Sequence, residues 1–255
     1  MRGHGLSEKP SSGYDMERIQ LDLEAALTQL NVSTPFVLVG HSFGGAVVTD
    51  YALNHPDHVE KLILIATAGE FRLAPLFRLG LTLPVSVLRI IGPLTRSWLH
   101  APPHALREFY HRNLSKWRGW DKFAQLAMPV MVIRGHRDLV FDRPLFEKVA
   151  GSIPGAEDVD IGASGHMVML ERREAVDRAI TSFLKGEPSK SWRDTSLVTA
   201  KSQRDELKRE RAWLSQYEEG VPYTVMCREF PCITCCVHRC GVFQIDRQFI
   251  SRAQN

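Results

Sequence analysis

Short apolar runs alternate with longer amphipathic segments along the first 185 residues of the chain. Within each run the apolar residues are consecutive rather than alternating, which is typical of strands that are buried on both faces of a parallel sheet. The predicted strands cover 35–40, 59–67, 128–135 and, with a weaker pattern, 157–162. Strands that alternate with helices favour an α/β fold, with a mostly parallel sheet covered by helices on both faces.

Three segments before, between and after these strands have the spacing of helices. Residues 14–32 carry apolar side chains at helical intervals, and Asp15 is suited to cap the N-terminus of that helix. The segment 44–56 reads as a helix stopped by Asn54 and Pro56. A third helix is expected over 174–184.

Residues 71–127 break the alternation of strands and helices. This segment holds five prolines among leucine-rich pieces, and five arginines with no acidic residue between Glu70 and Glu108. An ordinary helical insertion would explain the pattern. We favour a helical cap over a pocket, with a cationic and apolar surface suited to lipid-like or anionic substrates.

Composition narrows the class of protein. The chain has 255 residues, 44% hydrophobic residues and a formal net charge of +3, which is enough for a core and too little basic charge to indicate a nucleic-acid partner. The first ten residues contain no apolar signal-peptide core. The uncharged apolar run 79–88 is too short for a transmembrane helix. A cytoplasmic protein without a transmembrane segment is therefore expected.

The stretch "VLVGHSFGGAV" (37–47) places a serine in a glycine-flanked turn between a strand and a helix. The pattern Gly40-His41-Ser42-Phe43-Gly44 has the spacing of a nucleophile elbow, in which a tight turn lifts the serine hydroxyl above the sheet. The backbone N–H of Phe43 would then face developing negative charge as an oxyanion donor. A plain glycine-rich turn would share the five-residue pattern, but its position between this strand and this helix favours the elbow.

Two further residues could complete a catalytic triad with Ser42. Asp138 and His166 each follow a predicted strand, so all three residues are expected at the carboxyl edge of the sheet, in the chain order Ser, Asp, His. His166 would act as general base and acid, and Asp138 would orient it. Asp142 is an alternative acid further from the strand end. The other nearby histidines are interpreted as structural, with the His41 side chain pointing away from the hydroxyl: His4, His41 and His136.

Residues 2–185 resemble the α/β-hydrolase fold family. The resemblance is carried by "RGHGLS" (2–7), "VGHSFGG" (39–45), "IRGHRD" (133–138) and "GHMVMLERREAVDRAITSFL" (165–184). It implies a serine hydrolase with a helical cap that acts by acyl transfer on a small-molecule ester, thioester, lactone or activated C–C bond. It implies no cofactor and no metal, and a serine nucleophile is unlike the aspartate nucleophile of dehalogenases and epoxide hydrolases.

Family members have several strands before the loop that matches "RGHG", and here that loop begins at Met1. We therefore expect an α/β-hydrolase core over 1–185 that lacks the N-terminal strands, including the one whose loop supplies a second oxyanion donor. The strand 35–40 would then be an exposed sheet edge. The alternative function is a weak or inactive hydrolase-like domain that served as a fusion partner.

The remaining 70 residues differ in composition. Residues 186–225 read as a charged linker, and within it "ERAWLSQYEEGVPYT" (210–224) resembles the start of long-chain acyl-CoA synthetases, which implies fusion to a fatty-acid-activating ligase in a parent protein. The tail 226–255 holds all five cysteines and is expected to be disordered. A zinc site there is the weakest of the hypotheses, with the candidate ligands Cys232, Cys235, Cys236, His238 and Cys240.

Overall fold

The computed structural model describes residues 1–4, 7–72, 79, 102–138, 143–188 and 242–245. In these ranges five strands form one sheet in the order β4-β3-β2-β1-β5. The strands are β1 (Phe36–His41), β2 (Val59–Ile65), β3 (Val130–Arg134), β4 (Glu157–Asp160) and β5 (Val242–Ile245). The first four are parallel, so the expected parallel sheet and its four strands are confirmed, with ends that differ by no more than two residues.

Helices occupy the predicted segments and several others. They are α1 (Met16–Gln29), α2 (Phe43–Asn54), α5 (Pro103–Phe109), α6 (Trp120–Phe123), α7 (Arg143–Glu147), α8 (Val168–Glu171) and α9 (Arg173–Lys185). The expected cap of α1 is present, because the Asp15 carboxylate accepts a hydrogen bond of 3.0 Å from the N–H of Arg18. Helix α2 ends at Asn54, as the Asn54 and Pro56 pattern indicated.

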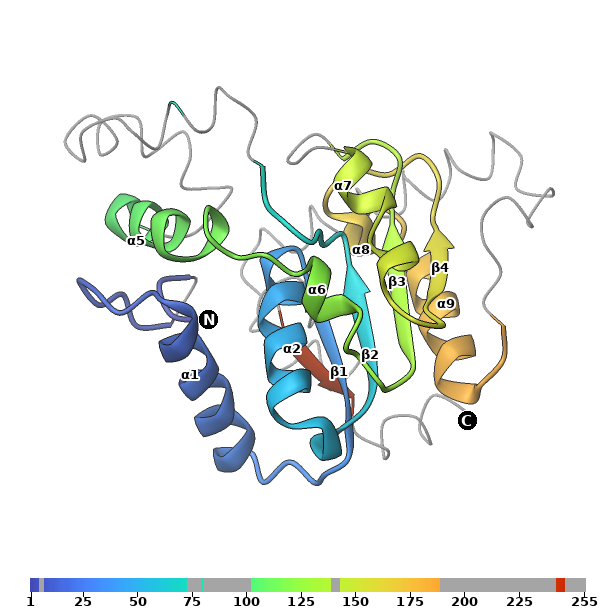
Figure 1. Cartoon of the computed structure of the whole chain (residues 1–255), viewed down its shortest axis with the longest axis horizontal. Helices are drawn as coiled ribbons and strands as arrows, with labels where there is room; N and C mark the ends of the chain where they lie inside the picture. The colour runs from blue at the N-terminus through green and yellow to red at the C-terminus, as the bar shows by residue number, and fades with distance from the viewer. Residues whose placement is uncertain (5–6, 73–78, 80–101, 139–142, 189–241, 246–255) are drawn as a thin grey trace, which may run out of the picture.

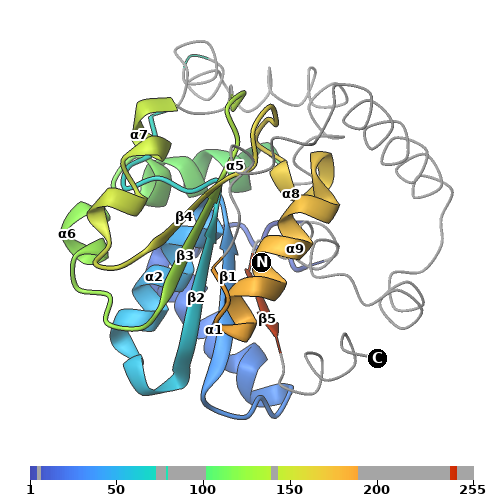
Figure 2. The same cartoon turned by 90° about the vertical axis from the view of Figure 1, so that its right-hand side faces the viewer.

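Helices cover both faces of the sheet. Figure 2 shows α2 and α6 on one side of the strands and α8 and α9 on the other. The centres of β1, β2 and β3 between them are apolar, and Leu38, Leu62 and Ile133 have no exposed surface. Helix α9 is tied to the sheet where Lys61 on β2 donates to the carbonyl oxygen of Phe183 at 2.7 Å. A cation at the C-terminus of a helix also stabilises its unpaired carbonyls.

The edge of the sheet differs from the expectation. β1 was expected to have an open side, but β5 pairs with it antiparallel, with Val39 opposite Phe243 (Figure 1). β5 also lies inside the tail that was expected to be disordered, so that prediction is wrong for residues 242–245. The physical reason is that a buried strand cannot leave its N–H and C=O groups unpaired, and "VFQI" is rich in residues suited to strands.

Parts of the other expectations fall outside the described residues. Within the predicted cap, the structure describes residues 71–72, 79 and 102–127. The last of these ranges contains α5, a π-helical turn (Tyr110–Leu114) and α6. The synthetase-like stretch, the cysteine cluster and all of the linker beyond residue 188 lie within 189–241 and stay predictions. Among the helices described, none combines the length and apolar character needed to cross a bilayer. The cytoplasmic location stays a prediction.

Candidate active site

Ser42 lies in a strained turn between β1 and α2. Its backbone has φ 55° and ψ −124°, a region that residues with a side chain rarely adopt and that typically costs about 1–3 kcal/mol. Neighbouring groups hold this conformation. The N–H of Ser42 donates to the carbonyl oxygen of Ile65 at 2.9 Å, and its own carbonyl accepts from the Thr67 hydroxyl at 2.8 Å.

The turn depends on glycines that let backbones approach closely. A Cβ at Gly40 would lie 2.5 Å from the carbonyl oxygen of Gly44, so the collision expected at Gly40 is with the backbone of the helix start. A Cβ at Gly45 would lie 2.3 Å from the Thr67 hydroxyl oxygen. The contact between Gly45 and Thr67 was missed by the sequence reasoning, because Thr67 is 22 residues further along the chain than Gly45.

His166 and Asp138 join Ser42 in a chain of hydrogen bonds. The Ser42 hydroxyl lies 2.9 Å from Nε2 of His166, and Nδ1 of His166 lies 2.6 Å from a carboxylate oxygen of Asp138. In the neutral tautomer with a proton on Nδ1, the ring donates to Asp138 and its Nε2 accepts from the hydroxyl. Only 4% of the Asp138 side chain is exposed, so water competes little for its carboxylate. This chemistry can move a proton from Ser42 to His166 while Asp138 stabilises the imidazolium.

The two loops that carry Asp138 and His166 are packed on each other. The N–H of Arg137 donates to the carbonyl oxygen of Ser164 at 2.8 Å. A Cβ at Gly135 would lie 2.1 Å from the Ser164 hydroxyl oxygen, so only glycine permits this approach. Because both loops leave the carboxyl ends of adjacent strands, β3 and β4, this contact sets Asp138 opposite the His166 ring.

The alternative residues occupy other positions. His136 bonds the carboxylate of Asp160, and the same carboxylate accepts from Arg134 at 3.2 Å. His4 stacks edge-on against Phe109, and burial lowers its pKa from 6.5. Asp142, the alternative acid, lies outside the described residues. The imidazole within hydrogen-bonding distance of the Ser42 hydroxyl is that of His166.

His41 lies closer to the site than the sequence indicated. Its Nε2 is 2.9 Å from the backbone carbonyl oxygen of His166, and the two imidazole rings have centroids 4.9 Å apart. We expected the His41 side chain to point away from the Ser42 hydroxyl, and its contact with His166 was not predicted. Its place directly before Ser42 was the only available signal.

The N–H of Phe43 is the first in helix α2, where intrahelical carbonyl partners are lacking. It is therefore suited to donate to an anion beside Ser42, as expected. The Phe43 ring packs on the predicted cap segment, with centroid distances of 5.5 Å to Phe71 and 4.7 Å to Phe109. Both described ends of that segment thus contact the start of α2 with apolar side chains.

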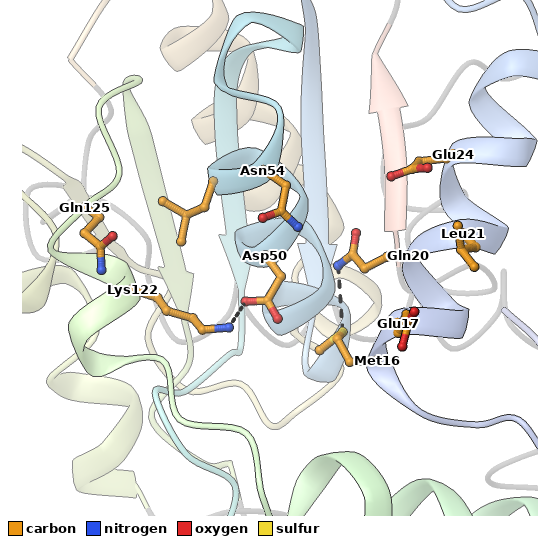
Figure 3. A pocket seen from close by; sticks show the side chains of 10 residues that line it. Met16, Glu17, Gln20, Leu21, Glu24, Asp50, Asn54, Lys122 and Gln125 are labelled. Carbon is orange, nitrogen blue, oxygen red and sulfur yellow. Dashed lines mark hydrogen bonds and ion pairs between the residues drawn. The ribbon is translucent and has the colours of Figure 1, made fainter.

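A groove of about 630 Å³ lies elsewhere, among α1, α2 and α6 (Figure 3). It is lined by the C-terminal half of α2, including Asp50, whereas Ser42 precedes the N-terminus of that helix. Asp50 is held there by Lys122 at 2.6 Å and by the indole N–H of Trp117. The groove therefore does not contain Ser42, Asp138 or His166. Within the described ranges no group of three or more His, Cys, Asp or Glu side chains is placed to hold a metal ion.

Comparisons with known proteins agree with this architecture. Residues 1–88, which include Ser42, match the sequence model of the alpha/beta hydrolase fold. Human protein ABHD8 is 29% identical over 215 residues, covering 75% of this chain and 49% of the relative. The cis-3-alkyl-4-alkyloxetan-2-one decarboxylase of Shewanella oneidensis is 26% identical over 227 residues, covering 71% of each chain. The chain spans about half the length of ABHD8.

The solved structures show the same fold. An esterase from Exiguobacterium antarcticum superposes with a TM-score of 0.60 at 24% identity, covering 72% of this chain and 79% of that one. Together with the parallel sheet, its helices on both faces and the turn at Ser42, this establishes that the chain has the α/β-hydrolase fold.

Proposed function

We propose that this chain is a serine hydrolase that cleaves a carboxylic ester or thioester through an acyl-enzyme on Ser42. The observation that carries the proposal is the hydrogen-bonded series Ser42–His166–Asp138, with spacings of 2.9 and 2.6 Å. A serine hydroxyl is a weak nucleophile at neutral pH unless a base takes its proton, and His166 is within reach of it. The name of the Shewanella relative refers to an oxetan-2-one, which is a cyclic ester.

In the proposed reaction the Ser42 oxygen attacks the substrate carbonyl carbon while its proton passes to Nε2 of His166. The carbonyl π electrons move onto oxygen, and the Phe43 N–H stabilises the resulting oxyanion. Collapse of this intermediate breaks the bond to the leaving alcohol or thiol, which takes the proton from His166. Water, deprotonated by His166, then attacks the acyl-enzyme, and the acid leaves as Ser42 regains its proton. The cycle needs no cofactor.

The apolar surroundings favour an apolar acyl group. The Phe43, Phe71 and Phe109 rings lie beside the turn, and each side chain is buried. Burial of a chain of methylene groups against such rings contributes roughly 0.8 kcal/mol per group. We therefore place acyl esters and acyl thioesters ahead of small hydrophilic esters as substrates.

The test is labelling with a fluorophosphonate probe, followed by intact mass measurement. The wild-type chain should gain one phosphonyl group, and Ser42→Ala should gain none. Ser152→Ala, which changes a serine in a short helix (Ala150–Ser152) outside the hydrogen-bonded series, should label like the wild type. Asp138→Asn should keep the fold and label more slowly by about a thousandfold or more, because the asparagine favours the wrong imidazole tautomer.

An unlabelled but folded wild-type chain would refute the proposal and favour the inactive alternative. If labelling is confirmed, hydrolysis rates for matched p-nitrophenyl esters and acyl-CoA thioesters of two and twelve carbons decide between ester and thioester and report the preferred acyl length. Equal rates for both lengths would contradict the apolar acyl preference.

A further inference from the structure

His41 joins the segment that carries the proposed nucleophile to the segment that carries the proposed base. It is the last residue of β1, directly before Ser42, and only 8% of its surface is exposed. Its ring lies 4.9 Å from the His166 ring at an angle of 51°, and its Nε2 is 2.9 Å from the His166 carbonyl oxygen. Because a carbonyl oxygen only accepts, the Nε2 of His41 must carry a proton and donate it to this bond.

We propose that His41 is a positioning residue, which fixes the backbone of His166 so that its ring stays aligned with the Ser42 hydroxyl. This inference rests on the proposed hydrolase function, because it assigns His41 a role in that same site. His41 takes no part in the proton transfer itself. It acts through His166.

The loop around His166 needs such an anchor. β4 ends at Asp160 and α8 begins at Val168, and the connection between them contains Gly162 and Gly165. Glycines widen the backbone conformations that a loop can reach, and Gly162 has a φ of 82°. The bond from Nδ1 to Asp138 fixes the ring of His166 and does not involve its peptide group. The bond from His41 to the His166 carbonyl holds that peptide group directly.

β1 is a firm support for this bond. It has hydrogen-bonded neighbours on both sides, β2 and β5, and His41 pairs in register with Ile65 of β2. The side chain that bonds the His166 backbone therefore belongs to the residue directly before Ser42. The His41 side chain thus links the two backbones directly, and the 2.9 Å contact between Ser42 and His166 depends on the distance between them.

The expected effect follows from the geometry. A displacement of about 1 Å between reacting groups can lower a rate by roughly a hundredfold. Loss of the His41 donor should therefore slow attack by Ser42 by about ten- to a hundredfold. KM should change by less than about twofold, since only 8% of His41 is exposed and little of its surface is available to a substrate.

Two variants with side chains of similar length distinguish the loss of the hydrogen-bond donor of His41 from the loss of its volume. His41→Gln retains an N–H at about the reach of Nε2, whereas His41→Met fills the space without a donor. Gln20→Met is the matched control, because it removes a buried side-chain donor from a backbone carbonyl oxygen outside the proposed triad, that of Val47 on α2, 2.8 Å away. Each variant is compared with the wild type by urea unfolding, by fluorophosphonate labelling rate, and by kcat and KM on an acyl ester.

We expect His41→Met to label ten- to a hundredfold more slowly with little change in KM, and His41→Gln to recover to within about threefold of the wild type. Gln20→Met should lose stability and keep the wild-type rate. Wild-type labelling by His41→Met, or an equal loss in His41→Gln, would overturn the inference while leaving the hydrolase function intact.

Proton NMR of the His166 imidazole supplies a readout that needs no turnover. The low-field Nδ1–H signal of His166 should be retained in His41→Gln and broadened or shifted in His41→Met. An unlabelled wild type would refute the hydrolase function alone. An Nδ1–H signal that is the same in His41→Met and the wild type would refute the positioning role, whether or not the chain is active.

Discussion

Gly45→Ala tests how tightly the nucleophile turn is packed on β2. The added Cβ would lie 2.3, 2.5 and 2.9 Å from the hydroxyl oxygen, Cβ and methyl carbon of Thr67. No rotamer of Thr67 relieves the contact with its Cβ, and Thr67 is 2% exposed, so the side chain cannot swing into solvent. Ordinary carbon–carbon contacts begin near 3.5 Å, so α2 and the end of β2 must separate by about 1 Å.

The magnitude follows from two opposing effects. Alanine is favoured over glycine inside a helix by about 1 kcal/mol, and Gly45 is the third residue of α2. Overpacking in a close-packed interior typically costs about 1–3 kcal/mol, and a clash with a rigid Cβ belongs at the upper end of that range. We expect a net loss of about 2 kcal/mol in the free energy of unfolding. The displaced turn should also slow probe labelling by about a hundredfold.

The control is Gly151→Ala, where the same substitution meets no atom within 4 Å. This variant should unfold at the same or a slightly higher urea concentration and label at the wild-type rate. Urea unfolding gives the first quantity, and labelling measured well below the unfolding midpoint gives the second. A Gly45→Ala chain as stable and as reactive as the wild type would refute the packing argument.

Two further predictions concern groups near the same turn. Thr67→Val should lower the free energy of unfolding by about 1 kcal/mol and also slow labelling, because it removes the hydroxyl that bonds the Ser42 carbonyl. Thr49→Val removes a similar buried bond, to the Gly45 carbonyl at 2.7 Å, and should cost stability only; equal labelling rates in the two variants would contradict the role of Thr67. His4→Gln should weaken the pH dependence of stability. Burial lowers the folded-state pKa of His4 from 6.5, so below about pH 6.5 the unfolded chain binds a proton more readily than the folded chain. The wild type therefore loses stability as the pH falls from about 6.5 to that lowered pKa. Urea titrations from about pH 5 to pH 7.5 check this, and parallel stability curves for the two chains would show that His4 contributes nothing.

The sheet and the three site residues could be predicted because their signals are local. A largely continuous apolar run identifies β1, β2 and β3, while β4 has a weaker pattern; the residue types that follow β1, β3 and β4 stand out against those strands. Since carboxyl ends of parallel strands meet at one edge, Ser42, Asp138 and His166 were expected together without any knowledge of the loops. The structure brings them within hydrogen-bonding distance.

The supports of the site could not be predicted, because they join residues distant in sequence. The Thr67 bond to Ser42 spans 25 residues and the His41 bond to His166 spans 125. Nothing about a threonine after a strand indicates that its hydroxyl faces a neighbouring turn. The pairing of β5 with β1 was also missed. The cysteines around 227–240 are the most prominent feature of the tail, and a four-residue strand has too short a pattern to stand out beside them.

The two ends of helix α2 make different contacts: one end holds the turn at Ser42, and the other holds α6. At the N-terminal end of α2, strain at Ser42 is held by bonds from Thr67 and from the N–H of Gly45, so a change there should move the proposed nucleophile. Further along the helix, Asp50 holds Lys122 and Trp117 and so fixes α6 and the segment before it. Loss of that contact would leave a buried carboxylate without its partners, which lowers stability. The strained turn is supported by the carboxyl end of β2 rather than by α6. The geometry at Ser42 therefore depends on that end of the sheet and not on the groove beside Asp50.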